Sequence, residues 1–196
     1  MQTAVVALHY QNEVLHPDGK IRLGVAEGAT GRDHLIERAG RLLAGARAAG
    51  VPVVSVRVAF RPDHADVMQN ARIFRDVVRL GAMVEGSWGA EFLHGLGPLP
   101  GEFVVTHNRI GAFHGSSLGD VLRVLGVGRL IVSGVATSSV VLTTVGQAAD
   151  LGYEVMVAQD ACSAARAETH AAALELMAIV ADIVLVDEAL ARLNRE

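Results

Sequence analysis

The chain has 196 residues, a net charge of −4, a hydrophobic content of 51% and a mean hydropathy of +0.36. This length suits one well-buried domain over residues 1–196. The sequence carries no basic block of the kind that nucleic-acid-binding proteins use, and no apolar run approaches the roughly 20 residues that a membrane span requires.

A single cysteine, Cys162, excludes an internal disulfide. Met1 leads directly into an apolar segment without a basic leader, so we expect no signal peptide. These features predict a cytoplasmic protein that binds neither nucleic acid nor a membrane.

Short apolar runs alternate with segments of helical pattern along the whole chain. In chain order, we expect strands at 3–8, 53–58, 102–106, 130–133, 154–158 and 183–186, and helices at 33–49, 118–125, 139–151 and 168–180. Alternation of this kind favours βαβ units with right-handed crossovers. The predicted fold is α/β, a three-layer α/β/α sandwich around a six-stranded, mainly parallel sheet.

Ligands of open α/β sheets bind beyond the carboxyl ends of the strands. Two histidines, His9 and His107, follow predicted strands at this edge, and each could instead fill a polar niche. The segment 134–139 follows a third strand and opens a predicted helix, whose unpaired backbone N–H groups would form an oxyanion hole. The long connection over 60–101 adds His64 and Trp88, because such connections often carry binding residues.

Several motifs occur in the order that one enzyme family shows. They are 3–13 with Gln11-Asn12, Trp88-Gly89, 107–118 with Gly111-Ala112-Phe113, Gly134–Thr137 with the later Gly152-Tyr153, and Asp160–Ser163 with His170. Together they resemble the isochorismatase-like hydrolases, also called the cysteine hydrolase superfamily. The resemblance covers nearly the whole chain and implies a homo-oligomer that binds a small molecule, with a cis peptide bond between Val135 and Ala136.

Enzymes of that family use an Asp to take the proton of a Cys thiol, a Lys to support charge, and the thiolate to attack an amide or nitrile carbon. The matching positions here are His9, His107 and Val140. Since Val140 has no reactive atom, the thiol route through this position is excluded. Cys162 belongs to a later motif, and we interpret it as a small packing residue.

Four alternatives for the chemistry remain open. The first is acid–base hydrolysis of a small carboxylate, vinyl ether or amide by His9 and His107, which would resist joint protonation. The second is attack by Ser139, although a hydroxyl at such a turn is more often a helix cap. The third is a metal bound by the two histidines with a third ligand from His64, Asp63 or Asp160. The fourth is loss of catalysis, leaving a binding or assembly protein.

Of these alternatives we predict the first, with no cofactor and no bound metal. The predicted catalytic residues are His9 and His107. The predicted substrate-binding residues are His64, Trp88, Arg109, Val135, Ala136, Thr137, Ser139 and Val140.

Overall fold

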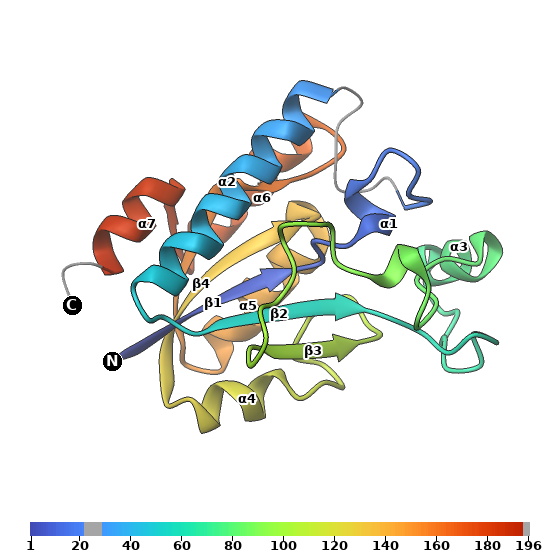
Figure 1. Ribbon diagram of the computed structural model, residues 1–196, viewed down its shortest axis with the longest axis horizontal. Helices are drawn as coiled ribbons and strands as arrows, with labels where there is room; N and C mark the ends of the chain where they lie inside the picture. The colour runs from blue at the N-terminus through green and yellow to red at the C-terminus, as the bar shows by residue number, and fades with distance from the viewer. Residues whose placement is uncertain (22–28, 194–196) are drawn as a thin grey trace.

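The computed structural model describes residues 1–21 and 29–193 (Figure 1). The strands are β1 Gln2–Leu8, β2 Val53–Val58, β3 Phe103–His107, β4 Val127–Val135, β5 Glu154–Ser163 and β6 Asp182–Val184. The helices are α1 Asn12–Leu15, α2 Ala29–Ala48, α3 Arg72–Leu80, α4 Leu118–Val124, α5 Leu142–Asp150, α6 Ala167–Met177 and α7 Val186–Leu193, with a 3-10 turn η1 at Trp88–Ala90 and a π-helical turn η2 at Thr137–Val141.

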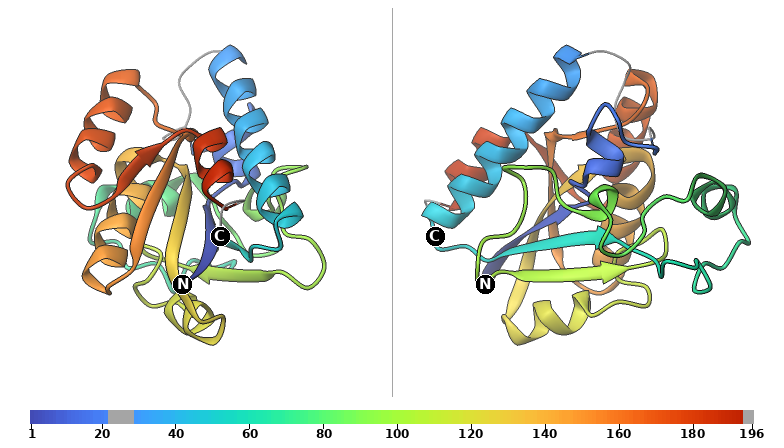
Figure 2. Two further views of the ribbon diagram at one scale, coloured as in Figure 1. Left: turned by 90° about the vertical axis from the view of Figure 1, so that its left-hand side faces the viewer. Right: turned by 45° about the vertical axis from the view of Figure 1, so that its right-hand side comes forward.

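The six strands form one sheet in the order β3-β2-β1-β4-β5-β6, and every neighbouring pair is parallel. Helices α2 and α7 cover one face, and α4, α5 and α6 cover the other (Figure 2). The predicted three-layer α/β/α fold is therefore confirmed. No helix within the described ranges is long and apolar enough to cross a membrane.

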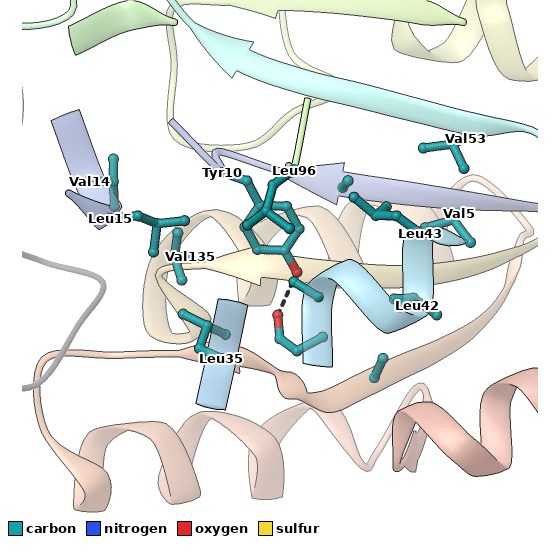
Figure 3. Packing of buried hydrophobic residues seen from close by; sticks show 14 of the residues in the cluster. Val5, Tyr10, Val14, Leu15, Leu35, Leu42, Leu43, Val53, Leu96 and Val135 are labelled. Atoms are coloured by element: carbon teal, nitrogen blue, oxygen red, sulfur yellow. Dashed lines mark hydrogen bonds between the residues drawn. The ribbon is translucent and has the colours of Figure 1, made fainter. Parts of the chain in front are cut away.

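Strand β1 lies at the centre of the sheet and is buried on both faces. Val5 and Ala7 pack into the cluster under α2, whereas Val6 and Leu8 pack into the cluster on the other side. This alternation follows from the two-residue period of a strand, and it explains why 3–8 is a continuous apolar run. The first cluster includes Tyr10, whose hydroxyl donates a 2.6 Å hydrogen bond to a β5 carbonyl (Figure 3).

Some predicted bounds are wrong. The sixth strand ends at Val184, and Val186, predicted to close it, begins α7 instead, where its N–H donates to Asp160 Oδ1 at 2.8 Å. Helices α1, α3 and α7 were not predicted. Each is short, with four, nine and eight residues, so its apolar pattern extends over too few turns to identify a helix from the sequence.

Candidate active site

A pocket opens at the carboxyl edge of the sheet, between β1 and β4. The order of strands reverses there, because β2 and β3 are added on one side of β1 whereas β4, β5 and β6 are added on the other. Such a reversal is the usual binding position in an open α/β sheet. The pocket has a cavity volume of about 70 Å³. Its lining residues are His9, Val14, Ile21, Val58, Phe60, Ile73, Phe74, Val77, Met83, Arg109, Ile110, Val135, Ala136, Ser139 and Val140. Three of these carry a polar side chain, namely His9, Arg109 and Ser139.

The two predicted catalytic histidines are in direct contact. Their Nε2 atoms lie 2.6 Å apart, and the rings stack with centroids 4.8 Å apart. His9 follows β1 with a φ of +58°, and its N–H donates to the carbonyl of Val56 in β2. His107 is the last residue of β3 and is 2% exposed. Thus His9 faces the pocket, and His107 supports it from behind.

The side chain of Gln11 fixes the chain just beyond His9. Its amide donates to the carbonyls of Val58 and Ala90 at 2.8 Å and accepts the N–H of Val58 at 2.8 Å. The end of β1 is therefore held against β2 and η1 by three hydrogen bonds. These three hydrogen bonds restrict the position of the His9 ring.

Burial disfavours the protonated, cationic form of both histidines. Burial lowers the pKa of His9 well below its ordinary value, and neighbouring His107 acts in the same direction. Burial also lowers the pKa of His107 to about 4. The backbone of Gly111 opposes that shift, although His107 Nδ1 makes no hydrogen bond of regular geometry within the described residues. At neutral pH the pair is uncharged, so one Nε2–H donates to the other Nε2.

The turn after β4 forms another wall of the pocket. The peptide bond between Val135 and Ala136 is cis, as the family resemblance implied. The N–H groups of Ser139 and Val141 both donate to the carbonyl of Ala136, at 3.1 and 3.3 Å. These two donors are satisfied inside the turn, so the expectation of freely available N–H groups does not hold for them.

The nucleophile alternatives lack support in this geometry. Val140 lines the pocket and is 2% exposed. The hydroxyl of Ser139 also reaches the pocket, but its hydrogen bond goes to the carbonyl of Ala136 at 3.5 Å, and no bond joins it to a histidine among residues 1–21 and 29–193. A serine nucleophile requires an adjacent base, and none is placed against Ser139.

Five of the eight predicted substrate-binding residues line the pocket, and three do not. His64 Nε2 is engaged with the carbonyl of Ala82 at 2.9 Å. Trp88 is 47% exposed and makes an edge contact with His16. Thr137 is fully buried, and its hydroxyl lies 2.8 Å from Nδ1 of His170. None of these three residues lines the pocket, so their contact with a ligand stays a prediction.

Sequence reasoning missed the apolar side of the pocket. Phe60, Met83 and three side chains of α3 supply it, namely Ile73, Phe74 and Val77. The one signal that pointed to them was the length of the 60–101 connection.

The third ligand of the metal alternative is not in place. Asp160 pairs with Arg38 at 2.7 Å, and Asp63 pairs with Arg61 at 3.1 Å. In the part of the chain that the structure describes, no three His, Cys, Asp or Glu side chains are grouped to hold a metal ion.

Cys162 lies in β5, where it pairs in register with Gly134 of β4. Burial raises the pKa of its thiol to about 12, so roughly one molecule in ten thousand holds the reactive thiolate at pH 8. We expect iodoacetamide to modify the native protein at least about 1,000-fold more slowly than the urea-unfolded protein. Mass spectrometry of time points under both conditions measures this ratio, and equal rates would contradict the buried position.

Known proteins resemble this chain over most of its length. The family model described as the isochorismatase domain matches residues 3–188. The uncharacterized isochorismatase family protein YecD of Escherichia coli is 31% identical over 168 residues, which are 86% of this chain and 83% of that protein. Maleamate amidohydrolase of Pseudomonas putida is 28% identical over 164 residues, which are 81% of this chain and 74% of that enzyme.

A solved structure agrees with the sequence comparisons. The isochorismatase family protein from Desulfovibrio vulgaris superposes with a TM-score of 0.84 at 31% identity, and the match covers 97% of this chain and 98% of the other. The similarity therefore includes the sheet, the helices of both layers and the carboxyl edge where the pocket lies.

Proposed function

Because the chain belongs to the isochorismatase family, we propose that it is a hydrolase that cleaves an amide-type bond in a small molecule by acid–base chemistry at His9 and His107, without a thiol nucleophile. The observation that carries this proposal is the 2.6 Å contact between the two Nε2 atoms at the edge of the pocket. The similarity to maleamate amidohydrolase favours an amide substrate over a vinyl ether or a carboxylate without an amide group.

The neutral pair has the properties that water activation requires. His9 takes a proton from water at Nδ1, the ring nitrogen that the histidine contact leaves free, as the water oxygen attacks the amide carbon. At the same time the Nε2 proton of His9 passes to His107 Nε2 across the 2.6 Å contact. The pair then delivers a proton to the amide nitrogen as the C–N bond breaks, so amide and water become acid and amine. A lowered pKa leaves the base free at neutral pH and makes the transient imidazolium a strong acid.

One observation favours a second function. Val140, which by resemblance corresponds to the family nucleophile, lines the pocket, and the N–H groups of Ser139 and Val141 are already bonded within the turn. A protein that binds a small molecule without converting it would have these features. The two functions differ in one measurable property, which is turnover.

A substrate panel tests the proposal. The panel contains small monoamides, ureido acids and vinyl ethers, and release of ammonia or of the acid product is followed by mass spectrometry. We expect turnover of at least one amide, and we expect it to survive pretreatment with iodoacetamide, since Cys162 is buried. Absence of turnover throughout the panel would favour the binding protein, and loss of turnover after thiol blocking would contradict the thiol-independent mechanism.

A further inference from the structure

The guanidinium of Arg109 is held at the pocket wall, and among the described residues its Nη1 amino group is left unpaired. Its Cζ lies 4.3 Å from the centre of the Phe74 ring, and its Nη2 donates to Asn70 Oδ1 at 3.1 Å. The Nη1 atom is buried and has no hydrogen-bond partner within the described residues. Leaving a charged donor buried and unpaired is costly, so this atom is suited to a ligand.

Among residues 1–21 and 29–193, no acidic group offsets the charge at this place. None of the residues that line the pocket is Asp or Glu, and Arg109 forms no ion pair with a carboxylate in the described part of the chain. Its neighbour Asn70 is uncharged. Because burial keeps His9 and His107 neutral near pH 7, Arg109 is the source of positive charge among the described side chains that line the pocket.

The rest of the lining is apolar. Twelve of the fifteen lining residues carry aliphatic, aromatic or methionine side chains. A polar ligand with several hydroxyl or amide groups would lose hydrogen bonds to water on entering and would find few replacements. A ligand with an apolar body and one anionic group would pack against the apolar lining and accept a hydrogen bond from Arg109 Nη1.

We propose that the pocket selects small molecules with an apolar body and a single carboxylate, and that Arg109 determines this specificity by binding the carboxylate through Nη1. The proposal rests on the proposed function in taking this pocket as the substrate site. It assigns Arg109 a specificity role and no part in proton transfer. The stacking on Phe74 and the bond to Asn70 hold the planar guanidinium, which favours a directed hydrogen bond to a carboxylate oxygen.

Binding of matched carboxylate and amide probes tests the proposal without requiring turnover. The probes are benzoate with benzamide, cyclohexanecarboxylate with cyclohexanecarboxamide, and crotonate with crotonamide, titrated at pH 7.5 by calorimetry or NMR. We expect at least one carboxylate to bind the parent protein about 10- to 100-fold more tightly than its amide, the range for a hydrogen bond to a charged group. Equal or weaker binding of all three carboxylates would overturn the proposal.

Three variants separate the specificity role from a structural one. Arg109→Met should abolish the carboxylate preference and leave amide binding within about threefold. Arg109→Lys should keep part of the preference, because it retains the charge without the planar fork, and it still tests the proposal if the Met variant unfolds. Arg123→Met removes an exposed charge of α4 that pairs with Asp120, and it should behave like the parent. A preference that persists in a folded Arg109→Met protein would overturn the proposal.

These outcomes are distinguishable from failure of the proposed function. A protein that binds the carboxylate through Arg109 but hydrolyses nothing would retain the specificity assignment and lose the catalytic one. A protein that hydrolyses a carboxylate-bearing amide equally well with and without Arg109 would retain the catalytic assignment and lose the specificity one.

Discussion

Replacement of His9 by Asn is expected to lower turnover of an amide substrate by about 10²–10⁴-fold, the usual contribution of a positioned acid or base. Asn is preferred to Ala in this test because the residue has a φ of +58°, a conformation that Asn adopts more readily than most residues. The variant removes the imidazole ring that lines the pocket and contacts His107 through Nε2. Steady-state kinetics on the best substrate of the panel, with thermal melting to confirm folding, measures the effect.

Val140→Ala is the matched control for this experiment. It changes a lining residue of the same pocket, but it removes only two methyl groups. We expect turnover within a few-fold of the parent and a loss of stability of about 2 kcal/mol from the cavity. If the His9→Asn and Val140→Ala proteins turned over substrate equally well, His9 would have no place in the mechanism.

The stability of the fold is expected to fall between pH 7 and pH 4 because His107 is buried as a neutral ring. Its folded pKa is about 4, whereas a histidine in the unfolded chain titrates near 6.5. Below pH 6.5 the unfolded chain therefore binds the proton that the folded protein excludes. This difference removes roughly 3 kcal/mol of unfolding free energy by pH 4, and His9 acts in the same direction.

Urea unfolding at pH 7, 6, 5 and 4 measures this loss. His107→Gln should flatten the curve relative to the parent, because the titrating group is gone. His114→Gln is the control, since His114 is exposed and the parent slope should persist in that variant. A parent protein equally stable at pH 7 and pH 4 would show that the histidine pair accepts a proton in the folded state.

The rule that ligands bind at carboxyl strand ends located the histidine pair, since His9 directly follows β1 and His107 is the last residue of β3. The rule could not show that their rings would touch, because β3 and β1 are separated by β2 in the sheet. That contact depends on the direction of each side chain beyond its strand. Side-chain direction also explains why the predicted ligand contact of Thr137 lacks support. Thr137 follows β4, but its hydroxyl lies against His170, and it is not among the residues that line the pocket.

Element bounds failed where tertiary contacts override the local pattern. Asp160 was expected just beyond its strand, yet β5 continues through it to Ser163. There it bonds to Arg38 of α2 and to the first N–H of α7. Apolar periodicity describes one element at a time, so it cannot predict a polar side chain that connects three elements.

The pocket is assembled from four stretches that are distant in the chain, within 9–21, 58–83, 109–110 and 135–140. None of them can form the cavity without the others, so a binding-competent pocket exists only once the central strands are in register. Occupancy is thereby coupled to the folding equilibrium of the whole chain, and a ligand at 100 times its dissociation constant adds about 2.7 kcal/mol to stability. A cell that supplies the ligand would thus also prolong the lifetime of the protein against proteolysis, whether or not the bound molecule is ever converted.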